Sequence, residues 1–296
     1  RSFGQTPLMA SARDLGILFN TDRLSGPEFI DYARRCETAG IESVWLAELF
    51  GREPFAAAGT LLASTTTLRV GTAIANVYAR DAIAAAAAAS TLAEVSGERF
   101  ELGLGVSNRG LNAARGHQWE PPARKMADYL EEIRAAELTL PDAGYPIQVA
   151  AHGPRMLETA AAGADGVFTY LMTPEHTART REGLPEAAQL SPMMMALLCP
   201  DPERARELAR KAIAFYIGLD YYHRAWRTLG FDEGDFADGG SDRLVDSVVA
   251  WGDADDIAAR LAAHAEAGAT RTVVIPLNPE GGGQPDWALL ETLGSL

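Results

Sequence analysis

The chain has 296 residues and a formal net charge of −14 at pH 7, with 47% hydrophobic and 22% charged residues. This is the composition of an ordinary globular protein with a large core. The acidic balance argues against nucleic acid or an anionic membrane as a partner, so any anionic ligand needs a local set of amide or arginine donors.

Cysteine and histidine usage excludes two further classes of site. The two cysteines, Cys36 and Cys199, lie far apart and form no CxxC motif. We therefore expect neither a disulfide framework nor a zinc site, and a cytoplasmic location. The five histidines show no HxH or HExxH spacing, so no metal site is predicted. No apolar run reaches the 18 residues that would suggest a membrane span.

Short strand-like runs alternate with longer helical patterns, which is typical of repeated βα units around a parallel sheet. Helices are expected at Pro27–Ala39, Asp81–Val95, Pro121–Leu138 and Asp253–Ala267. Eight strands are expected at Leu15–Asn20, Ser43–Glu48, Leu68–Ala75, Phe100–Ser107, Pro146–Ala151, Gly166–Tyr170, Met193–Cys199 and Arg271–Asn278. This count predicts an α/β fold, a closed (β/α)8 barrel of the TIM type. A doubly wound open sheet would look similar over the first five strands.

No linker divides the chain, so residues 14–296 are predicted to form a single barrel domain after an N-terminal tail at residues 1–13. A helical insertion is expected after the seventh strand, from about residue 215 to 249. It carries an aromatic group that could cover a planar ligand or pack against the barrel or a second subunit: Tyr216, Tyr221, Tyr222, His223, Trp226 and Phe231.

The predicted strands end at or near polar residues, and barrel enzymes collect their reactive groups at this face. These residues are Asn20, Glu48, Asn76, Asn108, His152, Tyr170, Cys199 and Asn278. Two glycine motifs nearby are incomplete. Arg109 stands where a GxSxG elbow needs glycine, and the segment that begins at Gly103 lacks the third glycine of GxGxxG.

An ordered set of segments resembles the bacterial luciferase-like superfamily, most closely the branch that uses the deazaflavin coenzyme F420. It includes Arg80 and the segments GIESVWLAE (40–48), LRVGTAI (68–74), GERFELGLG (97–105), PIQVAAHGP (146–154) and AGADGV (162–167). The resemblance extends from about residue 14 to residue 290. It implies a luciferase-like barrel enzyme that binds coenzyme F420, with FMN as the alternative cofactor.

The resemblance also implies where the cofactor would lie. A bulge with a cis peptide between Ala73 and Ile74 would face the ring, and Gly153 would expose amide donors of a following helix to the phosphate tail. The implied cofactor-binding residues are Ala73, Ile74, Asn76, Arg80, Ser107, Asn108, Ala151, His152 and Gly153. Members of the superfamily are often dimers, so a homodimer is expected.

Two positions depart from the family pattern. Leu49 stands where many relatives have a histidine, and Asn108 where the sugar-phosphate dehydrogenases have a glutamate. Because a base for alcohol oxidation is missing, we expect hydride transfer from reduced F420 to a small organic substrate. The catalytic candidates are proton donors: Glu48 as the acid, with His152 and Tyr170 as weaker candidates. Glu48 is also open to a structural role on loop amides or an arginine.

Two other functions remain open. One is an FMN-dependent monooxygenase on the same fold, and the other is a barrel that binds a flavin-like ligand without catalysis.

Overall fold

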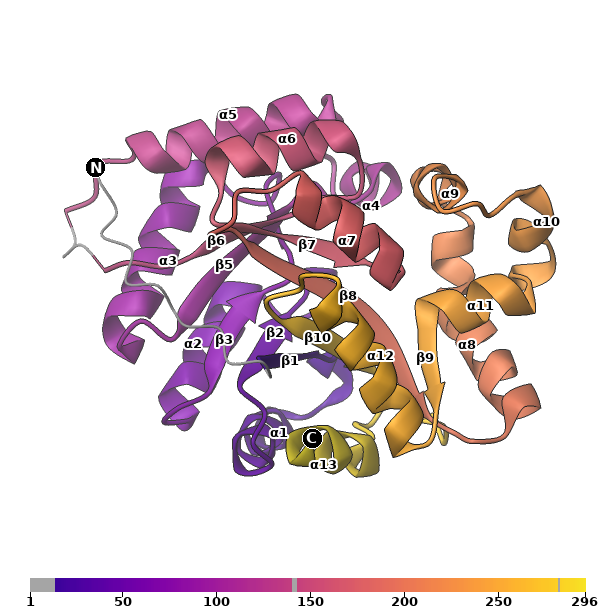
Figure 1. Ribbon diagram of the computed structural model, residues 1–296. Helices are drawn as coiled ribbons and strands as arrows, with labels where there is room; N and C mark the ends of the chain where they lie inside the picture. Colours follow the sequence, from indigo (N-terminus) through magenta and orange to yellow (C-terminus); the bar gives the residue numbers. More distant parts are fainter. Residues whose placement is uncertain (1–13, 140–142, 282) are drawn as a thin grey trace.

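The chain is described from a computed structural model, which covers residues 14–139, 143–281 and 283–296. The predicted tail, residues 1–13, lies outside the described residues. Eight parallel strands form a closed barrel with helices on its outside (Figure 1). They are β1 (Leu15–Leu18), β2 (Ser43–Leu46), β3 (Arg69–Thr72), β5 (Phe100–Gly105), β6 (Ile147–Ala150), β7 (Gly166–Tyr170), β8 (Gln189–Leu198) and β10 (Thr272–Pro276). The barrel closes because β10 pairs with both β8 and β1, which confirms the predicted (β/α)8 fold.

The four predicted helices are present, each shifted by one to three residues at its ends. They are α1 (Gly26–Thr38), α3 (Ala82–Ser96), α5 (Pro122–Ala135) and α12 (Ala254–Glu266). The outer layer also contains α2 (Pro54–Ser64), α6 (Pro154–Gly163), α7 (Pro174–Glu182) and α13 (Trp287–Ser295), with the short η1 (Thr21–Arg23) and α4 (Arg109–Ala114) in loops. None of the described helices is both long and apolar enough to cross a membrane.

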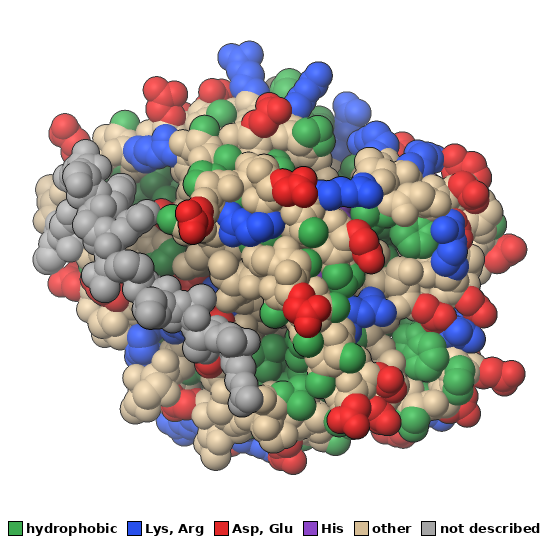
Figure 2. Space-filling model, viewed as in Figure 1, with side chains coloured by type: hydrophobic (Ala, Val, Ile, Leu, Met, Phe, Trp, Pro, Cys, Tyr) green, Lys and Arg blue, Asp and Glu red, His purple; other side chains and the backbone are tan. Residues whose placement is uncertain are grey.

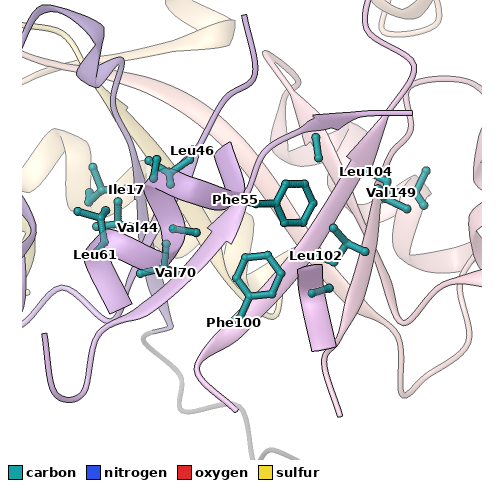
Figure 3. Packing of buried hydrophobic residues seen from close by; sticks show 14 of the residues in the cluster. Ile17, Val44, Leu46, Phe55, Leu61, Val70, Phe100, Leu102, Leu104 and Val149 are labelled. Atoms are coloured by element: carbon teal, nitrogen blue, oxygen red, sulfur yellow. The ribbon is translucent and has the colours of Figure 1, made fainter. Parts of the chain in front are cut away.

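Apolar side chains between strands and helices form the main core. Figure 3 shows Phe55 and Leu61 of α2 among residues of β2, β3 and β5. The ring centroids of Phe55 and Phe100 lie 5.9 Å apart. The buried face of α3 consists largely of alanine, for example Ala85 and Ala89. Because alanine has little bulk, this helix can approach the barrel closely.

The side chains inside the barrel are charged at one end and apolar further along the barrel axis. At the amino ends of the strands, Arg271 donates to both oxygens of Glu101 at 2.8 Å and to Asp14 at 2.9 Å. We call these three residues the Arg271 cluster. Next to this cluster, toward the carboxyl ends of the strands, the rings of Trp45 and Phe168 pack edge to face with centroids 5.0 Å apart. The interior is therefore filled, and free space for a ligand is expected only at the carboxyl ends of the strands.

The predicted helical insertion is confirmed, and it begins earlier than expected. It contains α8 (Pro202–Ile217), α9 (Asp220–Arg227), α10 (Glu233–Phe236), η2 (Ala237–Gly239) and α11 (Asp242–Val248), and lies beside β9 (Figure 1). These helices share a second core with the ends of β7 and β8. The sequence did not predict β9 (Val249–Gly252), a four-residue strand directly after a helix. It also missed the start of β8, because Pro192 interrupts the strand pattern but pairs with Thr169.

Candidate active site at the carboxyl ends of the strands

Glu48 follows β2 and is the centre of an ion-pair cluster. Arg80 donates to both of its carboxylate oxygens at 2.9 Å, and Arg115 donates to one of them at 3.3 Å. The backbone amide of Asn76 adds a donor at 2.8 Å. We call Glu48, Arg80 and Arg115 the Glu48 cluster. These contacts are those of the structural role that the sequence left open for Glu48, and its role as an acid stays a prediction.

Asn76 is fully buried in β4 (Ala75–Asn76) and joins this cluster to the loop after β5. Its side-chain amide donates to Asn112 of α4 at 2.9 Å. Asn112 in turn donates to the carbonyls of Val106 and Asn108 at 2.7 Å and 3.2 Å. Asn76 and Asn112 therefore use their side chains to hold neighbouring loops in place.

The peptide bond between Ala73 and Ile74 is cis, as the resemblance predicted. The glycines of β5 explain how this bulge fits against its neighbour. A Cβ atom on Gly103 would lie 1.8 Å from the carbonyl oxygen of Thr72, and one on Gly105 would lie 2.6 Å from the side chain of Ile74. These two glycines are therefore required for strand packing, which accounts for them without a phosphate-binding role.

The residues predicted to bind the phosphate tail, near Asn108 and near Gly153, differ in whether their backbone amides are free to donate. Asn108 caps α4, and its side chain accepts from the amide of Leu111 at 2.9 Å. The amide of Ala151 donates to Phe168 in the sheet at 2.9 Å. By contrast, no side chain caps α6 at Gly153, and a Cβ there would meet nothing within 4 Å. The open amides and helix dipole make α6 the better anion site.

His152 lies between that helix start and the insertion. Its ring centroid is 5.1 Å from that of Tyr222 and 6.1 Å from that of Tyr221. Burial lowers the pKa of His152 to about 3, with a smaller contribution from His176. Its Nδ1 atom is buried and has no hydrogen-bond partner among the described residues. At neutral pH the ring is therefore uncharged and cannot act as an imidazolium acid.

Tyr170 ends β7 and, like Ile74, packs against the interior cluster that contains Ala73. Its hydroxyl donates to the hydroxyl of Tyr216 on α8 at 3.1 Å. Burial and the neighbouring Tyr216 hold the pKa of Tyr170 well above its usual value. It is therefore a neutral phenol at the barrel mouth.

The structure does not bring all the polar strand ends to one site. Asn20 caps η1, Asn278 bonds to Gln284, and Cys199 packs with Leu197 and Ala205. Conversely, no sequence motif pointed to the buried Asn112. Of the aromatic residues of the insertion, Trp226 is fully buried and donates to Leu171 at 2.9 Å, as expected for packing against the barrel, whereas Tyr216 and Tyr221 are partly exposed. A role of these two tyrosines in covering a ligand stays a prediction.

The described residues fit a flavin-like ring with an anionic tail. Ala73 is small, and the adjacent Ile74 is partly exposed at the barrel mouth. Gly153 leaves space beside the uncapped start of α6. Arg80 is a poorer candidate for the tail than expected, because its guanidinium is held by Glu48 and Glu53.

Known proteins share this sequence pattern and fold. The family model described as luciferase-like monooxygenase matches residues 19–271. A 5,10-methylenetetrahydromethanopterin reductase of Methanolobus tindarius is 25% identical over 84% of this chain and 90% of its own length. A putative coenzyme F420-dependent oxidoreductase of Mycobacterium tuberculosis is 25% identical over 80% of this chain and 87% of its own.

Solved structures agree on the fold. The F420-dependent tetrahydromethanopterin reductase of Methanopyrus kandleri has a TM-score of 0.73 at 18% identity, covering 96% of this chain and 98% of that one. An F420-dependent secondary alcohol dehydrogenase, solved with an F420-acetone adduct, has a TM-score of 0.75 at 15% identity, covering 95% and 96%. The resemblance inferred from the sequence is confirmed: the chain belongs to the luciferase-like monooxygenase family.

Proposed function

We propose that this protein is an oxidoreductase that uses coenzyme F420 to reduce a small organic substrate. The relatives named as F420-dependent enzymes support the choice of coenzyme. The geometry at Ala73, Ile74 and Gly153 supports a ring site beside an anion site. When bound in its reduced form, coenzyme F420 would supply a hydride.

The contacts of Glu48 are the observation that carries the reducing direction. Hydride removal from an alcohol needs a base beside the hydroxyl group. Both oxygens of Glu48 are engaged by arginines, His152 with its pKa of about 3 is a weak base, and Tyr170 holds its proton. Reduction avoids this need, because the substrate only has to receive a proton.

The chain's own residues would then have distinct tasks. The amides at the start of α6 bind the anionic tail, and the bulge at Ala73 and Ile74 supports the ring. The Glu48 cluster holds the loops after β2, β4 and α4 in register. The helices of the insertion cover one side of the barrel mouth and reduce the access of water.

Two measurements test this proposal. Titration of the purified protein with coenzyme F420 and with FMN should give tighter binding of F420, seen as quenching of deazaflavin fluorescence. Reduced F420 should then turn over with a panel of enones and imines, whereas oxidised F420 should not turn over with alcohols or sugar phosphates. Tight copurification with FMN would favour the monooxygenase, and turnover confined to alcohols would reverse the direction.

The homodimer expected from the sequence also belongs to this proposal. The outer face of α3 exposes Ile83 and Val95, at 60% and 72% of their surface. Exposed large apolar residues on one helix are suited to burial against a second copy. Sedimentation equilibrium should give twice the chain mass, and a Val95→Glu substitution should shift it toward the monomer.

A further inference from the structure

The carboxyl-end face of the barrel has a charged part and an aromatic part. The Glu48 cluster lies after β2 and β4. The ends of β6 and β7, together with α8 and α9, carry rings instead. His152, Tyr170, Tyr216, Tyr221 and Tyr222 form a connected group with centroid distances of 4.7–6.5 Å. We call these five residues the aromatic wall.

The wall carries no charge at neutral pH. Burial raises the pKa of Tyr216, and it raises that of Tyr221 to about 12. His152 stays neutral for the reason given above. The other rings around Tyr216 are Tyr170, Phe215 and Tyr222. A ligand against this wall therefore meets flat apolar surface and hydroxyl groups, with no cation among these rings to pair with an anion.

The Tyr216 hydroxyl has an unused hydrogen. Within the part of the chain that the structure describes, its one hydrogen-bond partner is Tyr170, which donates to it at 3.1 Å. The bond uses one of the two hydroxyl hydrogens, so the pair keeps one hydrogen to donate, and with Tyr170 as the donor this is the hydrogen of Tyr216. Tyr170 and Ile74 both pack against the interior cluster that contains Ala73, so Tyr216 lies one ring away from the residues of the predicted ring site.

We propose that Tyr216, oriented by Tyr170, donates a hydrogen bond to the carbonyl oxygen or imine nitrogen of a neutral substrate with a planar apolar body. This inference rests on the proposed function and names its substrate class. A donor at this atom binds the substrate and draws electron density from the double bond, which favours attack at its carbon. The flat rings select a conjugated substrate, because such a molecule can stack against them.

The test uses cofactor-free protein and two matched probes, cinnamaldehyde and its carboxylate analogue cinnamate, with binding measured by titration calorimetry. Wild-type protein should bind the aldehyde about tenfold more tightly than the anion. Tyr216→Phe should weaken aldehyde binding about tenfold, and Tyr170→Phe by a smaller factor, because the donor remains but loses its orienting partner. Tyr32→Phe on α1 removes a distant buried hydroxyl and should leave binding unchanged.

A second readout separates this inference from the proposed function. Affinity for coenzyme F420 should be the same in wild type and Tyr216→Phe, while kcat/KM for an enone falls. Failure of F420 to bind, with aldehyde binding still dependent on Tyr216, would remove the proposed function and keep this inference. Equal aldehyde binding by wild type and Tyr216→Phe, tighter binding of cinnamate, or no measurable aldehyde binding would overturn it. Thermal melting of each variant checks that the fold is retained.

Discussion

Two arginine–carboxylate clusters lie at opposite ends of the same barrel, and they differ in burial. In the Arg271 cluster the side chains of Arg271 and Glu101 are 2% and 5% exposed. In the Glu48 cluster the carboxylate is equally buried, but Arg80 and Arg115 are 15% and 26% exposed. Figure 2 shows acidic and basic side chains interspersed over the face in view, and ion pairs at such exposed positions contribute little to stability.

Because the two clusters differ in burial, we expect the Arg271 cluster to stabilise the fold and the Glu48 cluster to hold the geometry of the site. Glu101 also accepts from Gln148 at 3.1 Å, and Gln148 accepts from Ser191 at 2.9 Å. The Arg271 cluster thus belongs to a polar network inside the barrel, which Arg69 continues from Asp14 and Glu101 to Glu42 near the surface. The arginines of the Glu48 cluster come from loops and reach solvent. This cluster can therefore position the site, and the loss of one arginine should lower the free energy of unfolding by less.

Removing one arginine from each cluster should give the largest contrast. Arg271→Met leaves Glu101 buried without its main partner, so we expect a loss of about 3–5 kcal/mol in the free energy of unfolding. Arg80→Met should cost about 1–2 kcal/mol, because Arg115 and the Asn76 amide still reach Glu48. Urea unfolding of both variants measures the difference. Equal losses would contradict the distinction between the two ends.

Acid should weaken the protein through buried histidines before it affects the Arg271 cluster. Burial lowers the pKa of His152 to about 3 and that of His264 to about 4, from 6.5. Their neutral forms contribute fully above pH 6.5. Below it the unfolded chain binds protons that the folded chain does not, so stability falls toward pH 4, by up to about 1.4 kcal/mol per pH unit for each histidine.

The carboxylate of Asp14 behaves differently. Burial alone would raise its pKa, but Arg271 and Arg69 bring it below 3.8, so its contribution to stability is lost only at still lower pH.

Urea unfolding between about pH 7 and pH 5 tests the prediction for the histidines. The free energy of unfolding should fall steeply in wild type and less steeply in His264→Gln. An unchanged slope in the variant would mean that carboxylates cause the acid sensitivity.

A substitution at Gly153 should have the smallest effect on stability and a clear effect on binding. A side chain there meets no atom within 4 Å, so Gly153→Val should change the unfolding free energy by less than about 1 kcal/mol. The added bulk would block the start of α6, and we expect affinity for coenzyme F420 to fall at least about tenfold.

Gly103→Ala is the matched control for a glycine that the fold requires. The Cβ atom of the new alanine would collide with the backbone of Thr72. We therefore expect the free energy of unfolding to fall by about 3 kcal/mol, at the upper end of the usual cost of overpacking a core. Fluorescence titration and urea unfolding of both variants give the comparison. Unchanged F420 affinity in Gly153→Val would move the tail site elsewhere.

The sequence by itself determined the architecture and the family. Alternating strand and helix patterns follow from local hydrophobic periodicity, so the eight barrel strands and four named helices could be located to within a few residues. The ordered family segments also predicted the cis bond at Ala73 and Ile74. Elements whose local pattern is weak were missed, such as the short β9 and the start of β8 around Pro192.

Only the tertiary structure decided which polar groups meet. Glu48 was predicted as an acid from its place after a strand, but whether Arg80 and Arg115 reach it depends on loops 32 and 67 residues away along the chain. The unused donor of Tyr216 likewise depends on packing between α8 and the end of β7. Periodicity encodes which face of an element is buried, whereas the partner of a buried polar group is set by the packing of distant segments.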